Sequence, residues 1–278
     1  MIDLLYTYSS NGPGKVVNNL KLGFNALGVE YRDNPENADQ NNNAIALQWH
    51  NNIFSYNPEK LIIGPNICTL PVDNKFVIEG NYKKILVPSQ WVYDLYSKWL
   101  PNDKMFVWPV GIDTNFFSDK SQEKKEFDCL IYFKRRSLED LLFIENFLKS
   151  KNQTYNTITY GSYKEEDFLD LISKSRYGII IDNTESQGIA IQEMMSCNLP
   201  LFVWDFEYWT DRGEPFQCKA TSIPFWNERC GVFTTKKENV QDSIENLINN
   251  LDFFNPRSYI IENLSLEKKA KDITNILN

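Results

Sequence analysis

The sequence predicts an α/β protein with two Rossmann-like domains that face each other across a cleft. Its 278 residues are more than one small domain needs. Short apolar runs alternate with amphipathic helical patterns in both halves of the chain, which favours parallel sheets flanked by helices. We place the N-terminal domain at residues 1–112 and the C-terminal domain at 113–278, with a last helix that crosses back to the first domain.

The N-terminal half opens with a strand, a glycine-bearing turn and a helix, the first part of a βαβ unit. The strand is predicted at 2–8, the turn at 9–14 and the helix at 15–28. Five apolar side chains recur on one face of this helix: Val16, Val17, Leu20, Phe24 and Leu27. Gly28 provides a C-terminal stop, because glycine readily adopts the left-handed conformation that ends helices.

The rest of the N-terminal half contains short buried strands separated by polar segments. Residues 31–43 are polar and are predicted to lack regular structure. Strands are predicted at 44–50, 61–66 and 84–89, and a helix with an N-terminal Ser cap at 89–100. The segment 105–112 ends this half.

The C-terminal half begins after a polar, charged segment at 113–126 that is typical of a linker. Strands and helices then alternate regularly. Strands are predicted at 127–133, 155–161, 178–182 and 199–205, and helices at 137–150, 164–177 and 188–197. An aromatic-rich irregular loop spans 206–231, and two final helices are predicted at 238–251 and 266–277.

Composition and charge exclude several classes of protein. A net charge of -8 argues against a nucleic-acid binder, which needs a basic surface for phosphates. The N-terminus lacks the features of a signal peptide, and no apolar run is long enough to span a bilayer. We therefore expect a cytoplasmic protein with at most peripheral membrane contact. The five scattered cysteines are typical of reduced thiols.

Polar side chains follow successive predicted strands of the C-terminal half, where ligands bind in open α/β sheets. Lys134, Arg135 and Arg136 follow one strand, and three adjacent cations can neutralise a diphosphate. Glu185 follows another strand, and Gly188 opens a helix whose N–H groups favour anions. Alternatively, the cations form a solvated charge run and the acids are ordinary residues at a helix start. The occurrence of both at successive strand ends favours a site.

Four segments of the sequence resemble the signatures of family 4 glycosyltransferases. Residues 185–193, ESQGIAIQE, resemble the E-x7-E motif, with Glu185 and Glu193 as its two acids. Residues 107–117 resemble that family's interdomain segment, 85–96 its Pro-Ser strand–helix turn, and 10–28 its glycine-rich first loop and helix. The four segments cover nearly the whole chain in the family's order.

The resemblance implies a GT-B fold and a retaining, metal-independent transferase that uses a nucleoside-diphosphate-sugar as substrate, with no separate cofactor. It implies a glycan or lipid-linked acceptor, bound on the N-terminal side. The implied catalytic residues are Glu185, Lys134, Arg135 and His50. The implied donor-binding residues are Asn11, Gly12, Gly14, Arg136, Tyr160, Gly161, Tyr163, Gln187, Gly188, Ile189 and Glu193.

Several features depart from that family's pattern. The N-terminal domain is short, the three cations are adjacent instead of spaced, and Gln187 stands where the family has Phe. His50 follows a strand, where the family often has a cleft histidine, but a partly buried histidine with backbone partners is an equal alternative. Two alternative functions stay open: a nucleotide-sugar epimerase or phosphorylase on the same fold, and a non-catalytic nucleotide-sugar-binding module. A NAD-binding enzyme is disfavoured because SNGPG is not the G-x-G-x-x-G motif.

Overall fold

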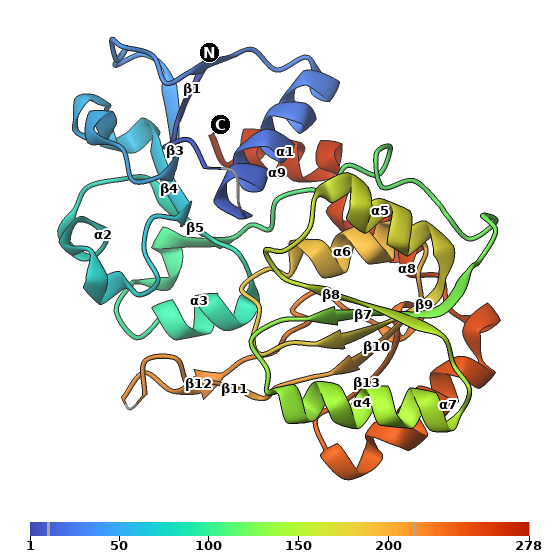
Figure 1. Cartoon of the computed structure of the whole chain (residues 1–278). Coiled ribbons are helices and arrows are strands. Elements are labelled where there is room, and N and C mark those ends of the chain that lie inside the picture. Colours follow the sequence, from blue (N-terminus) through green and yellow to red (C-terminus); the bar gives the residue numbers. More distant parts are fainter. Residues whose placement is uncertain (10–11, 214, 278) are drawn as a thin grey trace. The chain divides into compact units, whose positions relative to one another are not determined.

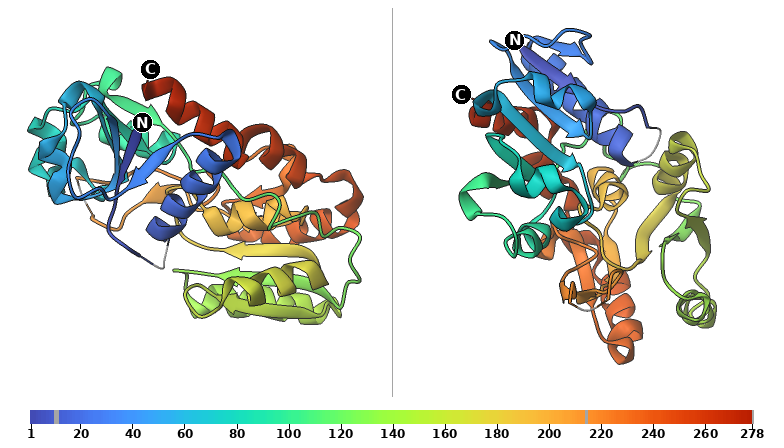
Figure 2. Two further views of the ribbon diagram at one scale, coloured as in Figure 1. Left: turned by 90° about the horizontal axis from the view of Figure 1, so that it is seen from above. Right: turned by 90° about the vertical axis from the view of Figure 1, so that its left-hand side faces the viewer.

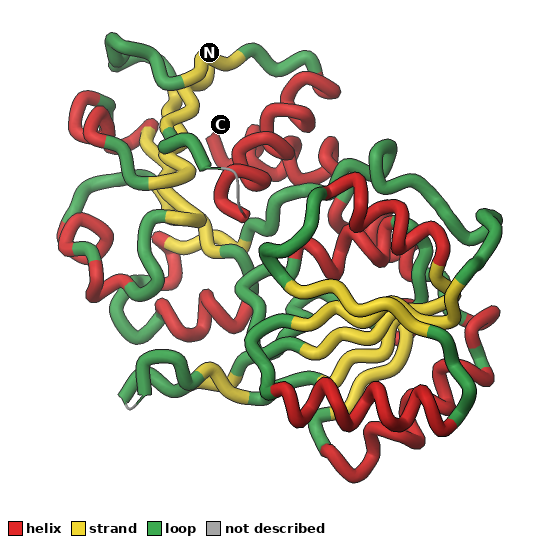
Figure 3. Tube along the Cα trace, in the orientation of Figure 1, coloured by secondary structure: helices red, strands yellow, loops and turns green. Residues whose placement is uncertain are grey.

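The chain folds into two compact α/β units. The computed structural model describes residues 1–9, 12–213 and 215–277. The first unit comprises Met1–Asp113 together with the chain from Leu264 onward, and the second comprises Thr114–Asn263. Each unit contains a sheet with helices packed against it (Figures 1 and 3).

Within the described residues, the first unit has a six-stranded sheet in which all neighbouring strands are parallel. The strand order is β2-β1-β3-β4-β5-β6. The strands are β1 (Ile2–Leu5), β2 (Tyr31–Asp33), β3 (Asn43–Gln48), β4 (Leu61–Asn66), β5 (Lys84–Val87) and β6 (Met105–Val107). β3 and β4 are buried along most of their length, which explains the apolar runs at 44–47 and 61–63 in the sequence.

Helix α1 packs against the C-terminal helix of the chain (Figure 2). The helices of the first unit are α1 (Gly12–Leu27), α2 (Lys75–Glu79), α3 (Gln90–Tyr96) and α9 (Leu266–Leu277). A Cβ atom at Gly23 would lie 2.9 Å from the Cβ of Ala270, so only glycine allows α1 and α9 to approach this closely. The predicted apolar face of α1 is buried except for Leu27, which is 40% exposed at the last turn.

The second unit has a five-stranded parallel sheet in the order β13-β10-β9-β7-β8, counted over the described part of the chain. Its strands are β7 (Phe127–Phe133), β8 (Tyr155–Thr159), β9 (Ser175–Ile181), β10 (Leu201–Trp204) and β13 (Gly231–Thr234). Its helices are α4 (Leu138–Ser150), α5 (Glu165–Lys174), α6 (Ile189–Ser196), α7 (Val240–Asn249) and α8 (Pro256–Leu264).

Helices cover both faces of the second sheet (Figures 1 and 3). On one face, α4 and α7 bury a cluster that includes Ile131, Ile179 and Phe202. On the other face, Tyr132 packs on Phe168 of α5, and α6 lies close to β9. Burial on both faces leaves the carboxyl edge of the sheet as the place where polar side chains gather.

One predicted helix is shorter in the structure than the sequence suggested. We predicted a helix over 164–177, but α5 ends at Lys174 and β9 begins at Ser175. Residues 175–177 alternate between buried and exposed, and Tyr177 is buried in the core beneath α4. Pairing with β7 therefore overrides the local helical pattern.

Several further segments have regular structure that the sequence analysis missed. β2 lies in the predicted irregular segment 31–43, and neither β13 nor α8 was predicted. The loop over 206–231 contains a small antiparallel hairpin of β11 (Tyr208–Trp209) and β12 (Cys218–Lys219). β2 and β13 have three and four residues, too few to show a period, and become strands only by pairing with β1 and β10.

Among the residues described, none of the helices is both long enough and apolar enough to cross a membrane.

Candidate functional site

Three neighbouring strands of the second unit end side by side, and each is followed by a charged residue. β9 lies between β7 and β10. Lys134 directly follows β7, Asp182 follows β9, and Asp205 follows β10. The backbone N–H of Lys134 donates a 2.9 Å hydrogen bond to the carbonyl of Ile181, so the loops after β7 and β9 start in register.

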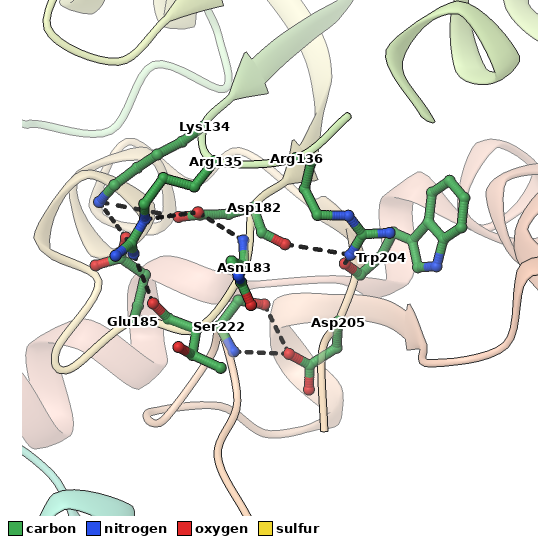
Figure 4. Close-up of polar contacts among 10 residues, drawn as sticks. Lys134, Arg135, Arg136, Asp182, Asn183, Glu185, Trp204, Asp205 and Ser222 are labelled. Atoms are coloured by element: carbon green, nitrogen blue, oxygen red, sulfur yellow. Dashed lines mark hydrogen bonds and ion pairs between the residues drawn. The ribbon is translucent and has the colours of Figure 1, made fainter. Parts of the chain in front are cut away.

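Two of the predicted cations converge on one of the predicted acids (Figure 4). The ammonium group of Lys134 forms an ion pair with Oε1 of Glu185. Nη2 of Arg135 lies 3.0 Å from the same oxygen and donates a 2.6 Å hydrogen bond to the carbonyl of Thr184. Residues 50 positions apart in the sequence therefore form one charged cluster, because β7 and β9 are adjacent strands.

A second carboxyl group, Asp182, belongs to the same cluster and was not predicted from the sequence. Its side chain is fully buried, and its carboxylate accepts a 2.7 Å hydrogen bond from the backbone N–H of Asn183. Nε of Arg135 lies 3.6 Å from Oδ1 of Asp182, and Nζ of Lys134 lies 3.9 Å from Oδ2. The signal for it was available: Asp182 ends the apolar run GIIID, at the edge where ligand sites form.

The two carboxyl groups of the cluster have pKa values shifted in opposite directions. Burial, and then the adjacent Glu185 carboxylate, raises the pKa of Asp182 to about 8. Burial alone would raise the pKa of Glu185, but a hydrogen bond from Asp182 and the charges of Lys134 and Arg135 outweigh it and lower that pKa. Paired titrating groups with separated pKa values are typical of functional sites.

The backbone and ring contacts of the two cations fix their positions. Arg135 has a φ of 50°, a left-handed conformation that costs an L-residue about 1–2 kcal/mol and is found preferentially at functional sites. The ammonium group of Lys134 lies 4.1 Å from the ring centroid of Tyr160, which is 48% exposed. Gly161, the next residue, has a φ of 79°. Tyr163 packs its ring against Tyr132 and Phe168.

Arg136 points away from the other two cations (Figure 4). Its Nε lies 3.0 Å from Oδ2 of Asp140, and its guanidinium lies 4.6 Å from the ring of Trp204. Nη1 also donates to the carbonyl oxygens of Asp182 and Trp204, at 3.3 and 3.4 Å. In this structure Arg136 therefore ties the ends of β9 and β10 to α4 and does not join the Glu185 cluster.

Gly188 lies at the start of α6, where the sequence analysis placed the opening of a helix. Gly188 is the N-cap residue, with a φ of 79° and a ψ of 47°, and Ile189 begins the helix. Gln187 is buried and bonds reciprocally with Gln192: each side-chain amide donates to the other residue, at 3.1 and 2.8 Å. Glu193, which the sequence analysis took as the second acid of the motif, is 2% exposed.

Asp205 fixes the segment that lies against Glu185 and Gly188, and it too was missed. Its carboxylate accepts 2.7 Å hydrogen bonds from the backbone N–H and hydroxyl of Ser222 and from the hydroxyl of Thr221. The carbonyl of Thr221 accepts a 3.0 Å hydrogen bond from the N–H of Glu185. Asp205 thus positions the Glu185 loop through an intermediate segment (Figure 4).

The remaining predicted site residues belong to the first unit. His50 lies just beyond β3, and its Nδ1 accepts a 3.2 Å hydrogen bond from the backbone N–H of Asn52. Gly14 lies in the first turn of α1, where a Cβ would come within 1.7 Å of the carbonyl oxygen of Ser9. At Gly12 a Cβ would meet no atom within 4 Å. Asn11 lies outside the described residues.

No family model matches the sequence, and no curated protein matches it significantly. Solved structures do match. The galactosyltransferase WaaB of the lipopolysaccharide outer core, in its apo form, gives a TM-score of 0.60 at 10% identity, covering 99% of this chain and 98% of its own. Sucrose-phosphate synthase from Thermosynechococcus elongatus gives 0.59 at 12% identity, with 99% and 98% coverage. An S. aureus TarM mutant in complex with UDP, fondaparinux and α-GlcNAc-glycerol gives 0.56 at 15% identity, with 81% and 52% coverage.

At such low sequence identities, these TM-scores show a shared fold and no more. The neighbours are glycosyltransferases of the GT-B type, and two of them match this chain over nearly its whole length and theirs. The predicted fold class, two parallel-sheet α/β domains of the GT-B type, is confirmed.

Proposed function

We propose that this chain is a retaining glycosyltransferase of family 4 that transfers a sugar from a nucleoside-diphosphate-sugar to a glycan or lipid-linked acceptor. One observation carries the proposal: Lys134 and Arg135 meet at Glu185, at the carboxyl ends of two adjacent parallel strands and beside the glycine that opens α6. We further propose that the second unit binds the donor and that the first unit binds the acceptor.

The two cations suit a leaving diphosphate. When the glycosidic bond breaks, negative charge develops on the β-phosphate oxygens, and cations that are already in place stabilise it. Arg135 can make two parallel hydrogen bonds to phosphate oxygens, whereas Lys134 acts as a compact point charge. The N–H groups at Gly188 and Ile189 add partial positive charge at the start of α6. Such electrostatic stabilisation needs no metal, and we propose a metal-independent reaction.

The acidic and aromatic residues suit the rest of the donor. Glu185 would accept hydrogen bonds from sugar hydroxyls, and Glu193 would bind the ribose diol. Tyr160 is exposed beside Lys134 and would stack on the base. Two neighbours support this class of ligand: one TarM structure contains UDP, and starch synthase IV from Arabidopsis thaliana is bound to ADP and acarbose.

A thermal-shift panel tests donor binding and identifies the base. A ligand that binds only the folded state at 100 times its Kd adds about 2.7 kcal/mol to the free energy of unfolding. We expect one of UDP, GDP, ADP and CDP to raise the Tm clearly above the others, and the Arg135→Ala variant to lose most of that shift. If none of the four raises the Tm, donor binding is refuted.

Product analysis then distinguishes the proposed transferase from its two alternatives. With the matching nucleotide-sugar, we expect diphosphate release that depends on added acceptor, an α-to-α or β-to-β product, and rates unchanged by EDTA. An epimerase would convert the sugar without any acceptor. A binding module would retain the thermal shift and release no diphosphate with any acceptor.

A further inference from the structure

The cluster at the ends of β7 and β9 contains two carboxyl groups and two cations. The cations lie closer to one carboxyl group than to the other. Lys134 and Arg135 both contact Glu185 at bonding distance. Their separations from Asp182, 3.9 and 3.6 Å, exceed the range of a good hydrogen bond. Asp182 is nevertheless the more buried of the two, with a side chain that is 0% exposed against 13% for Glu185.

A buried carboxylate so weakly paired is costly when ionised, and the usual result is that it binds a proton. The adjacent Glu185 carboxylate adds to this effect, because two carboxylates at one site do not readily ionise together. The same two causes, burial first, raise the pKa of Asp182 to about 8. A protonated Asp182 can also donate a hydrogen bond to Glu185, which lowers the pKa of Glu185.

We propose that Asp182 is a positioning residue that carries a proton and donates it in a hydrogen bond to Glu185, so that the pair presents one negative charge to Lys134 and Arg135. This inference about ligand binding rests on the proposed function. When diphosphate oxygens bind the two cations, Glu185 remains next to them. The proton on Asp182 then holds Glu185 in place and limits the carboxyl pair to a single negative charge. The proton thus compensates for part of the positive charge that the two cations now direct to the ligand.

The proposal has a consequence at alkaline pH, where Asp182 has lost its proton. Binding a diphosphate then brings a third anionic group to two carboxylates, and the pair takes up one proton from the buffer. The only bond formed is the carboxyl O–H, and the buffer acid becomes its conjugate base. Nucleoside diphosphates are fully ionised at this pH and contribute no proton themselves.

Other titratable groups interact with the cluster or lie at a neighbouring strand end. The hydroxyl of Tyr132 on β7 is held neutral, because burial raises its pKa far above the usual value. Asp211 in the β11–β12 hairpin acts on Arg135 and favours its charge. Asp205 at the end of β10 has its carboxylate bonded to Ser222 and Thr221. Tyr132 does not titrate between pH 5 and 9. Asp182 is therefore the group whose replacement should abolish the proton uptake.

The first experiment uses the ligand-free protein and so does not depend on donor binding. Urea unfolding of the wild type is compared with Asp182→Asn, whose amide keeps the acceptor for Asn183 and can donate to Glu185 without titrating. Above pH 4 the unfolded Asp182 is ionised while the folded one stays protonated up to about 8, so raising the pH favours unfolding. We expect the stability of the wild type to fall relative to the variant between about pH 4 and 8.

Asp128→Asn is the matched control for that experiment. Asp128 lies at the opposite end of β7 and is held ionised by the hydrogen bonds of Thr154 and the charge of Arg176, which lower its pKa. The curve of this variant should run parallel to the wild-type curve between pH 5 and 9. Parallel curves for the wild type and Asp182→Asn would overturn the proposal. If Asp182→Asn fails to fold, Glu185→Gln replaces it. Removing the second carboxylate should also reduce the dependence of the free energy of unfolding on pH that the wild type shows.

The second experiment measures protons directly. Calorimetric titration with the nucleoside diphosphate that gives the largest thermal shift is run at pH 8.5 in buffers of different ionisation enthalpy. We expect the wild type and Asp128→Asn to take up more than about half a proton, and Asp182→Asn to take up almost none. Binding without proton uptake by the wild type would overturn the inference and leave the proposed function intact. If no nucleotide binds, the proposed function fails, and the ligand-free comparison alone decides whether Asp182 holds the proton.

Discussion

The backbone N–H of Glu185 donates a 3.0 Å hydrogen bond to the carbonyl oxygen of Thr221. This bond joins the loop after β9 to a segment beyond the β11–β12 hairpin, and Asp205 holds that segment through the side chains of Thr221 and Ser222. The position of the proposed catalytic acid therefore depends on a carboxylate at the end of a different strand.

Replacing Asp205 should damage both stability and turnover. Asp205→Ala removes the acceptor for Thr221 and Ser222 and leaves buried donors without it, so we expect a loss of about 2–4 kcal/mol in the free energy of unfolding. Turnover with the matching donor should fall because the Glu185 loop loses its support. Urea unfolding and diphosphate release measure the two effects. Asp205→Asn, which keeps one oxygen, should lie between wild type and Asp205→Ala; wild-type values for both variants would show that the segment is held by other contacts.

Arg135 allows side-chain function and backbone strain to be separated. Arg135→Ala and Arg135→Gly both remove the guanidinium, and each should lower turnover by about 10²–10³. Only glycine also relieves the left-handed backbone at this position, so Arg135→Gly should be more stable than Arg135→Ala by about 1 kcal/mol. The measurements are initial rates and thermal unfolding. Equal stability of the two variants would mean that the φ of 50° costs nothing in the folded protein.

Gly14 and Gly12 form a natural pair for testing the first loop. A Cβ at position 14 would collide with the carbonyl of Ser9, whereas position 12 is open. Gly14→Ala should therefore lose at least about 1–3 kcal/mol of stability, although alanine is the better helix former. Gly12→Ala should stay within about 0.5 kcal/mol of the wild type. Chemical denaturation of the two variants decides this, and a Gly14→Ala protein as stable as wild type would argue that the loop can move freely away from α1.

The acid side of the stability profile should depend on Asp128. Burial would raise its pKa, but hydrogen bonds from Thr154 and the charge of Arg176 outweigh burial and lower it. A carboxyl group with a lowered folded pKa stabilises the protein above its unfolded pKa of about 4, and that stabilisation disappears as the pH falls through the folded pKa. We expect wild type to exceed Asp128→Asn in stability at pH 6 and to converge with it near pH 2. A difference that stays constant from pH 6 to 2 would contradict this assignment.

Much of the fold could be predicted from the sequence because its signals are local. The runs 44–47, 129–133 and 177–181 within β3, β7 and β9 are almost fully buried and contain no charged residue, so they were recognisable as strands. The helix starting at Gly188 was evident from the glycine and the pattern that follows it. The limits of α5 and the existence of β2 and β13 were not, because pairing with a neighbouring strand decided them.

By itself, the sequence determined that Lys134, Arg135 and Glu185 follow strands of the same half of the chain. The pairing of β7 with β9, which only the tertiary structure shows, brings them into contact. The tertiary structure alone decided the different roles of three adjacent cations, since Arg136 turns toward Trp204 and Asp140. It also decided that Asp182 is buried beside Glu185 and that Asp205 supports the Glu185 loop. The physical reason is that burial, and the distances between groups far apart in the chain, set the charge state and position of a side chain, and neither is encoded in local sequence.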